Sequence, residues 1–241
     1  MKPYKVFLPL ITATFVPGQW ALAAFHFMQI EQVISGVNGD TSAQAIQLRM
    51  RTAAENFVSS TRLIAVDATG SNPVILKDMT TNVANGQAGR RVLITTPSFA
   101  NYTDVPLVSD FDMVPIPTSY LSAGQLRYQD DFGTILWSLS WGGSAYTGPT
   151  TGSTTNDSNG NFGPPVSMSL SNSGLQALRF TGNVSALSTS NSLQYALTAQ
   201  AAVFTNNAGN SFTVVAPVPE PSCYVMLFAW LLVASRSRRR R

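Results

Sequence analysis

Apolar and polar residues alternate in short runs along most of the middle of the chain. Ile46, Leu48 and Met50 are each followed by a polar residue, and Leu126 and Tyr128 repeat the pattern. A period of two residues places the apolar side chains on one face of an extended strand, as half-buried antiparallel strands require. The pattern therefore predicts an all-β body.

Further strands are predicted on both sides of these two. The run 135–141 has one apolar face that includes Trp137 and Trp141, with Leu136 as the exception, and the run 193–201 has the same period. The remaining candidates are residues 25–34, 61–67, 73–79, 91–96 and 176–181. About nine short strands, separated by turns rich in Gly, Asn and Asp, indicate an antiparallel two-sheet sandwich.

The strand pattern delimits one domain at residues 24–204. Within it, residues 142–165 are rich in Gly, Ser, Thr and Asn, and they predict a long polar surface loop. Residues 205–218 are predicted to be mainly a polar spacer, with a short final strand at 212–215 as the alternative.

The first residues have the composition of a secretory signal peptide. Lys2 and Lys5 precede an apolar stretch, and Ala21 and Ala23 supply the small-x-small pattern that signal peptidase reads. Cleavage after Ala23 would remove a helical signal peptide at residues 1–23. The alternative is that the apolar stretch forms a first core strand.

The last residues combine a rigid tripeptide, an apolar run and a basic end. Pro219 and Pro221 flank Glu220 and favour an extended segment that a processing enzyme can bind in a cleft. The apolar run 222–235 has 14 residues, about 21 Å as a helix, which is short for a bilayer core of about 30 Å. Arginines that reach the lipid headgroups would help such a helix to span the membrane. These arginines are Arg236, Arg238, Arg239, Arg240 and Arg241. A buried amphipathic helix with a basic tip is the alternative.

In this order, the three parts resemble the bacterial PEP-CTERM sorting signal. The resemblance implies that residues 219–241 hold an exported protein at the inner membrane until an exosortase processes it at Pro219-Glu220-Pro221, with the arginines as the membrane stop. It also implies a Gram-negative-type bacterium and a final location at the cell surface or in the extracellular matrix. Basic residues beside both apolar segments place the chain between them on the exported side. The apolar run departs from the family in its bulkier residues Tyr224, Phe228 and Trp230.

The order of the predicted strands supports a second resemblance, to the lamin-tail-like domains of bacterial PEP-CTERM proteins. The stretches that carry it are residues 27–39 (FMQIEQVISGVNG), 43–51 (AQAIQLRMR), 89–96 (GRRVLITT), Phe99 and residues 111–121 (FDMVPIPTSYL). The resemblance covers roughly residues 25–165 and implies an immunoglobulin-like sandwich. The chain departs from that family at Gln47 and Arg49, where an acidic residue is usual.

Removal of both ends would change the charge of the protein. The whole chain has a formal net charge of +3, but the part from Ala24 to Val218 has eight Lys or Arg and eleven Asp or Glu. The body is therefore mildly acidic, and no nucleic-acid partner is predicted. The one cysteine, Cys223, lies in the predicted anchor, so the body has no disulfide.

No set of catalytic residues is recognisable in the sequence of the body. His26 is its one histidine, and the Gly-x-Ser-x-Gly elbow that would accompany a Ser-His-Asp triad is missing. Lys77 is its one lysine, and Val74 stands where a Ser-Lys dyad needs its serine. A zinc site needs several His or Cys ligands, and the body has one His and no Cys. The chain is therefore predicted not to be an enzyme and to need no cofactor.

Two pairs of carboxylates remain as candidates for chemistry. Asp110 and Asp112 would lie on one face of a strand, and Asp130 with Asp131 would lie in a turn. Glycoside hydrolysis needs two carboxylates across a cleft, whereas these positions favour hydrated structural roles. Residues 156–161 (NDSNGN) are the candidate calcium loop, although a single carboxylate favours a flexible polar loop.

Sugar binding through stacking would need exposed aromatic rings. Trp137 and Trp141 share an apolar strand face and are predicted to lie in the core. Tyr102 and Tyr146 lie in loop-like contexts and are the candidates for exposed rings.

Together these features predict an exported, non-enzymatic protein of the cell envelope or extracellular matrix. The implied partners are signal peptidase, exosortase, the inner membrane for a time, and exopolysaccharide. One alternative is a secreted carbohydrate- or calcium-dependent binding module, which would show exposed coplanar aromatics or converging oxygen ligands. The other is a secreted hydrolase, which would show two carboxylates facing one cleft.

Overall fold

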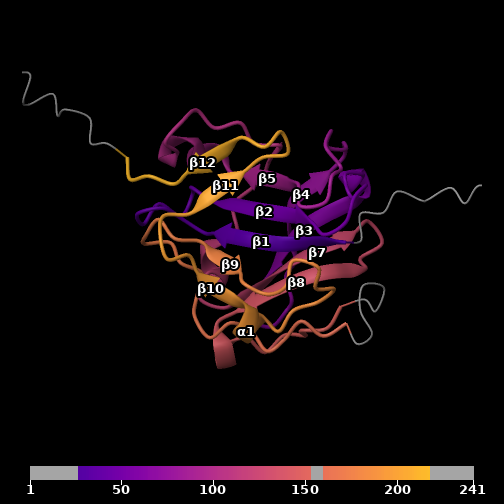
Figure 1. The fold of residues 1–241 in the computed structure, drawn as a ribbon. Coiled ribbons are helices and arrows are strands. Elements are labelled where there is room, and N and C mark those ends of the chain that lie inside the picture. The colour runs from indigo at the N-terminus through magenta and orange to yellow at the C-terminus, as the bar shows by residue number, and fades with distance from the viewer. Residues whose placement is uncertain (1–26, 153–159, 218–241) are drawn as a thin grey trace, which may run out of the picture.

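The computed structural model describes residues 27–152 and 160–217, which form two main β-sheets and a small third one (Figure 1). The six-stranded sheet consists, from edge to edge, of β10 (Tyr195–Leu197), β9 (Leu178–Phe180), β1 (Met28–Ile34), β2 (Ala45–Met50), β5 (Arg91–Thr95) and β6 (Phe111–Asp112). The four-stranded sheet consists of β4 (Val74–Met79), β3 (Thr61–Val66), β7 (Gly124–Asp130) and β8 (Ile135–Trp141). The third sheet is a hairpin of β11 (Val203–Thr205) and β12 (Ser211–Thr213).

Few helices interrupt these sheets. Within the described residues, α1 (Asn191–Gln194) is the single α-helix and is one turn long. Short 3-10 turns occur at Val58–Ser60, Pro97–Tyr102, Thr118–Tyr120 and Gly143–Ala145. The described part of the chain is therefore of the all-β class, as the alternation of apolar and polar residues predicts.

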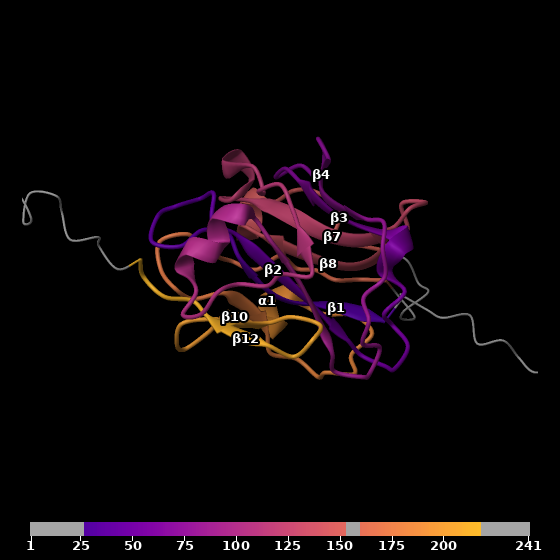
Figure 2. The same cartoon turned by 90° about the horizontal axis from the view of Figure 1, so that it is seen from above.

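The two main sheets pack with an apolar core between them, as in a sandwich. Figure 2 shows β3, β4, β7 and β8 on one side of β1 and β2, with the β11–β12 hairpin on the other side. Trp137, Trp141 and Tyr128 of the four-stranded sheet are fully buried in one cluster with Ile30 and Leu48 of the six-stranded sheet. The prediction that both tryptophans belong to the core is confirmed.

A chain of hydrogen bonds crosses this core. Trp137 Nε1 donates to the Tyr195 hydroxyl (2.9 Å), which donates to the backbone carbonyl of Ile30 (2.6 Å). Burial raises the pKa of Tyr195 well above its ordinary value, so the hydroxyl keeps the proton that it donates. The chain joins β8 to β10 and β1, and it satisfies polar groups that burial separates from water.

Most strands lie inside the predicted ranges, but the prediction for residues 193–201 is wrong in part. Leu193 belongs to α1, its side chain is 81% exposed, and only Tyr195–Leu197 is a strand. The backbone N–H of Asn191, at the start of α1, donates to the carbonyl of Phe162 (3.0 Å). A contact with a distant segment therefore supports a helical turn where the local pattern predicts a strand.

The prediction of a polar spacer at 205–218, and with it a domain end at 204, is wrong for the described residues up to 217. The alternative, a short strand at 212–215, is closer, because β12 pairs with β11. The hairpin covers an apolar cluster on the outer face of the six-stranded sheet, the face that points away from the core. This cluster consists of Ile34, Val37, Ala43, Ala45, Leu93, Phe99, Ala177, Ala202, Phe204, Phe212 and Val214. Removal of these side chains from water stabilises the hairpin against the sheet.

Two smaller predictions also need correction. Residues 142–165 are not wholly a surface loop, because Phe162 is fully buried and its ring centroid lies 5.7 Å from that of Trp137. The sheets are not wholly antiparallel, because β5 and β6 run parallel to each other. The short parallel strand β6 closes one edge of the six-stranded sheet.

Both predicted targeting segments lie outside the described residues. These are the signal peptide at 1–23, with Ala21 and Ala23, and the sorting signal at 219–241. They therefore stay predictions. Between residues 27 and 152 and between 160 and 217, no helix has the length and apolar character that a membrane span needs.

Candidate functional site

The carboxylate of Asp110 holds two backbone segments together. Its Oδ2 accepts hydrogen bonds from the backbone N–H of Leu93 (2.7 Å) and of Asn207 (2.9 Å). Its partner in the predicted pair, Asp112, is exposed and accepts a hydrogen bond from the hydroxyl of Ser109 (3.3 Å). Asp110 therefore ties the turn of the β11–β12 hairpin to β5.

The second pair of carboxylates lies where β7 ends at Asp130 and the turn to β8 begins at Asp131. Asp130 Oδ1 accepts hydrogen bonds from the backbone N–H of Phe132 (3.0 Å) and of Thr134 (2.7 Å). Asp131 forms an ion pair with Arg62 of β3 at 3.0 Å. Each of the four carboxylates thus has a hydrogen-bond or ion-pair partner within the protein, and these contacts favour structural roles for them.

The stability of the protein should depend on the ionisation of Asp110. Burial raises the pKa of Asp110 above its ordinary value of 3.8, although its two backbone hydrogen bonds oppose the shift. The folded state then binds this proton more tightly than the unfolded state does. Ionisation of Asp110 therefore lowers the free energy of unfolding as the pH rises from the ordinary value through the raised folded pKa.

Asp110→Asn should remove this pH-dependent step without loss of stability at neutral pH. The backbone N–H groups of Leu93 and Asn207 donate to the same carboxylate oxygen. The side-chain carbonyl of an asparagine can therefore accept both hydrogen bonds, and it carries no charge. Asp110→Ala should instead cost about 2 kcal/mol or more, because two buried N–H groups lose their acceptor. Urea denaturation at about pH 4 and about pH 7 measures both effects. If Asp110→Asn lowered the free energy of unfolding at neutral pH as much as Asp110→Ala does, this account would be contradicted.

The aromatic residues offer little surface for stacking on sugars. Trp137 and Trp141 are fully buried. The expectation of an exposed Tyr146 is wrong, because this residue is 5% exposed and its hydroxyl donates to the carbonyl of Pro149 (2.9 Å). Tyr102 is half-buried and donates its hydroxyl to an aspartate carboxylate (2.9 Å). A carbohydrate site built on these rings therefore has no support.

The remaining candidates from the sequence are scattered or undescribed. Lys77 lies over the ring of Phe111 at 5.4 Å, a cation–π contact between β4 and β6. His26 and most of the calcium-loop candidate 156–161 lie outside the described residues, so the calcium loop stays a prediction. Within 27–152 and 160–217, no group of three or more His, Cys, Asp or Glu side chains is placed to hold a metal ion.

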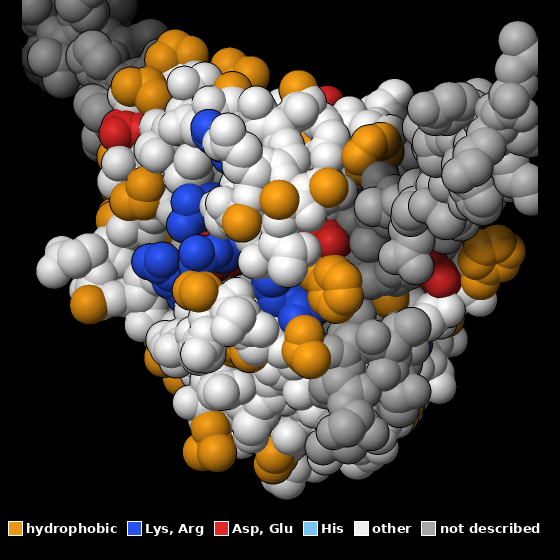
Figure 3. Space-filling view, turned by 45° about the vertical axis from the view of Figure 1, so that its right-hand side comes forward, with side chains coloured by type: hydrophobic (Ala, Val, Ile, Leu, Met, Phe, Trp, Pro, Cys, Tyr) orange, Lys and Arg blue, Asp and Glu red, His pale blue; other side chains and the backbone are white. Residues whose placement is uncertain are grey.

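A cluster of arginines around a buried glutamate is the polar feature that the sequence did not reveal. Arg91 binds Glu31 through Nε (2.7 Å) and Nη2 (3.1 Å), and Gln47 Nε2 donates to the same carboxylate (2.7 Å). Arg49 and Arg179 each lie 3.8 Å from Glu31 Oε1. We call Arg49, Arg91 and Arg179 the arginine cluster. Figure 3 shows Lys and Arg side chains gathered together on one face of the molecule.

The register of four strands brings the cluster together on the outer face of the six-stranded sheet. Arg179 lies on β9, Glu31 on β1, Arg49 on β2 and Arg91 on β5, which are consecutive neighbours in the sheet. The β1–β2 pairing shifts at Glu31, which has no paired partner on β2, as at a β-bulge. The side chain of Glu31 is 4% exposed, so the carboxylate is held below the three guanidinium groups.

Two hollows lie beside the cluster on this face. The central hollow, about 310 Å³, is lined by Gln29, Glu31, Arg49, Arg179 and Thr181, among others. The second, which we call the β10 hollow, measures about 410 Å³ and shares Arg179 and Thr181 with the first. Its other wall is formed by the chain from Ala196 to Ala201 and by Val203.

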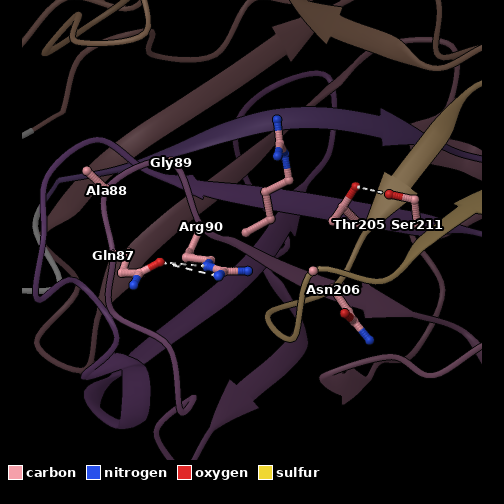
Figure 4. A pocket seen from close by; sticks show the side chains of 9 residues that line it. Gln87, Ala88, Gly89, Arg90, Thr205, Asn206 and Ser211 are labelled. Atoms are coloured by element: carbon pink, nitrogen blue, oxygen red, sulfur yellow. Dashed lines mark hydrogen bonds between the residues drawn. The ribbon is translucent and has the colours of Figure 1, made fainter.

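A third hollow, of about 390 Å³, lies on the other side of the cluster, between Arg91 and the β11–β12 hairpin. We call it the hairpin hollow. Figure 4 shows Gln87 and Arg90 on one side of it and Thr205 and Ser211 on the other. Gln87 accepts hydrogen bonds from the Arg90 side chain at 3.2 and 3.3 Å, and the two hydroxyl groups lie 3.1 Å apart. The hollow thus combines a cation with hydroxyl groups.

Comparison of the chain with protein-family models, with curated proteins and with solved structures found no match. No relative therefore assigns a role to the arginine cluster or to the three hollows. Their chemistry has to be inferred from their own residues and contacts.

Proposed function

We propose that this protein is an exported, non-enzymatic protein of the cell envelope or extracellular matrix, sorted through a signal of the PEP-CTERM type. The observation that carries the proposal is the order of three segments: Pro219-Glu220-Pro221, the apolar run 222–235 and the terminal arginines. A signal-peptide-like segment at 1–23 places the body on the exported side of the inner membrane. Processing by signal peptidase and an exosortase then leaves the body near the exopolysaccharide of a Gram-negative-type bacterium.

The contacts of the body support a role without catalysis. Asp110 and Asp130 accept hydrogen bonds from backbone N–H groups, and Asp131 pairs with an arginine. Trp137 and Trp141 are fully buried between the sheets and help to hold them together. The body has no cysteine and therefore no disulfide. Such a body suits a stable structural or binding protein outside the cytoplasm.

We infer further that the sandwich is of the immunoglobulin type, with a lamin-tail-like body. In immunoglobulin variable domains, the first, second, fifth and fourth core strands share one sheet, and the third, sixth and seventh share the other with added neighbours of the third. The described part of this chain lacks the fourth strand, and β6 lies at its place beside β5. Here β1, β2 and β5 are consecutive in one sheet, and β4, β3, β7 and β8 form the other. Strand β6 and the segments after β8 are additions to this arrangement.

The sorting proposal is tested by the intact mass and location of the protein, expressed with and without its exosortase. We expect a chain that begins at Ala24 and ends near Pro221, and only when the enzyme is present. A Pro219→Ala, Pro221→Ala double variant should stay uncut in the inner membrane, because its segment no longer favours the extended conformation. Pro217→Ala, just outside the tripeptide, is the matched control and should be processed normally. A C-terminus that stays uncut regardless of exosortase would reduce the segment to an ordinary anchor and refute the proposal.

A further inference from the structure

The arginine cluster holds more positive charge than its glutamate can neutralise. Glu31 is the one acidic side chain among the described residues that line the three hollows. Arg49 and Arg91 are paired directly opposite each other on β2 and β5, and like charges at such positions repel. Arg90 adds a further cation in the hairpin hollow. Half of the eight basic residues of the mildly acidic body thus gather on one face.

This face also has hydrogen-bonding capacity that the protein does not use. At 3.8 Å from Glu31, Arg49 and Arg179 are beyond hydrogen-bond distance, and no side-chain hydrogen bond of either is found among the described residues. Arg49 Nε and Gln29 Oε1 are buried without a partner. Gln29 is only 1% exposed, and it lines the central hollow. Buried polar atoms normally have partners, so these atoms point to a ligand.

The three hollows follow one another across the sheet. The β10 hollow and the central hollow share Arg179 and Thr181. The central hollow meets the hairpin hollow at the arginine cluster. Glu31, which lines the central hollow, accepts a hydrogen bond there from Arg91, which lines the hairpin hollow. A row of hollows suits an extended chain better than a compact ligand, since each hollow can hold one unit of it.

We propose that these hollows form one groove that binds a linear polysaccharide bearing carboxylates, a polyuronate. The guanidinium fork matches the planar carboxylate and can donate two parallel hydrogen bonds to it. Arg49 and Arg179, which lie 3.8 Å from the Glu31 carboxylate and so are not hydrogen-bonded to it, supply the forks. The hydroxyl groups of Thr181, Thr205 and Ser211 supply partners for sugar hydroxyls. The biological partner rests on the proposed export into a matrix, but the chemistry of the groove does not.

The lining of the groove favours a polysaccharide over a nucleic acid. Single-stranded nucleic acids are held by aromatic rings on which successive bases stack. Among the described residues that line the hollows, Phe180 is the one aromatic, and it is 8% exposed. Duplexes are held by many phosphate contacts, whereas the rest of this body has more acidic than basic residues. Small apolar residues of the β10 hollow, such as Ala196 and Ala199, instead suit the flat faces of sugar rings.

Titration of the purified protein with polygalacturonate by calorimetry tests the proposal, with dextran as the uncharged polymer. We expect binding of polygalacturonate but not of dextran, and weaker binding as salt is added. Arg49→Ala and Arg179→Ala should each weaken the affinity about tenfold, because each removes charge-assisted hydrogen bonds. Arg49→Lys keeps the charge but loses the planar guanidinium. Its affinity for polygalacturonate should lie between that of Arg49→Ala and that of the unchanged protein.

Arg62→Ala is the matched control. Arg62 lies on the other sheet, and its side chain is 29% exposed, against 24% for Arg49. Its replacement should leave the affinity unchanged, and thermal melting checks that every variant is folded. Equal weakening by Arg62→Ala, no binding of polygalacturonate, or equal binding of dextran would each overturn the proposal. Tighter binding of single-stranded DNA than of polygalacturonate would also overturn it, in favour of a nucleic-acid partner.

The binding test and the sorting test can fail independently. Calorimetry uses purified protein and needs no exosortase, so a negative result leaves the sorting proposal untouched. A C-terminus that is never processed would refute the sorting proposal, while polyuronate binding that depends on Arg49 and Arg179 would still stand.

Discussion

Replacement of Phe212 by alanine is expected to lower the free energy of unfolding by about 3–5 kcal/mol. Phe212 is 2% exposed on β12 and is paired with Phe204 of β11, whose ring packs edge to face on Phe99 at 5.4 Å. The substitution leaves a cavity in the apolar cluster under the hairpin. An isolated two-stranded hairpin is marginal in water, so its docking depends on this cluster. Urea denaturation followed by tryptophan fluorescence measures the change.

Val203→Ala is the control for this prediction. Val203 lies on β11 next to Phe204, but its side chain is 48% exposed. Loss of an exposed apolar side chain should change stability by no more than about 0.5 kcal/mol. If Phe212→Ala cost no more than Val203→Ala, residues 205–217 would be the polar spacer that the sequence predicts, and the hairpin would not be part of the folded body.

The hairpin also decides which part of the outer face stays open. The outward side chains of β2 change character along the strand. Ala45 lies under the hairpin, Gln47 accepts a hydrogen bond from the backbone N–H of Thr205, and Arg49 lines the central hollow. One strand thus contributes to the second apolar cluster and to the proposed groove, so the position of the hairpin affects both stability and binding.

The strands that the sequence predicts well are those in which one face is buried by the main core. In β2, Ile46 and Leu48 are fully buried between the sheets, and in β8 Trp137 and Trp141 are too. Burial of one face is a local property of an antiparallel strand, and it leaves a period of two in the sequence. The class of fold and most strand positions could therefore be predicted from that period alone.

The predictions that failed depended on contacts with distant residues. Leu193 fits the alternating pattern, but the N-terminus of α1 is bonded to Phe162 and the side chain points to solvent. Tyr146 lies in a Gly- and Ser-rich context that suggests exposure, but it folds back to bond Pro149 and is buried. Phe212 stands among polar residues, and only the cluster beneath it explains its burial.

The arginine cluster could not be predicted because it is assembled from four strands. Arg49, Arg91 and Arg179 each occupy a polar position of a strand, where an exposed charge is ordinary. Only the order β9–β1–β2–β5 makes them neighbours. The bulge at Glu31 appears in the sequence only as a break in the alternation, where the two polar residues Glu31 and Gln32 stand together.

Glu31→Ala is expected to lower the free energy of unfolding by about 2–3 kcal/mol, because it removes the buried acceptor of charge-assisted hydrogen bonds. Arg91 would lose the carboxylate that accepts its two hydrogen bonds, and Gln47 would lose the acceptor of its side-chain amide. The three guanidinium groups would also repel one another without a carboxylate between them. Glu31→Gln should cost less, since an amide oxygen can still accept a hydrogen bond. Chemical denaturation at low and high salt measures the loss, which should shrink with salt because the guanidinium groups are partly exposed.

Asp131→Ala is the control, because it breaks an ion pair of Arg62 in which the carboxylate is 37% exposed, against 4% for Glu31. An exposed pair of this kind should cost no more than about 1 kcal/mol. Suppose that Glu31→Ala lowered the free energy of unfolding as little as Asp131→Ala does, or by an amount that does not change with salt. Either result would show that the arginines do not depend on Glu31 for their placement. Polygalacturonate should restore part of the stability of Glu31→Ala, because a ligand that binds only the folded protein stabilises it. Its carboxylates would then occupy the place between the arginines that Glu31 occupies in the unchanged protein.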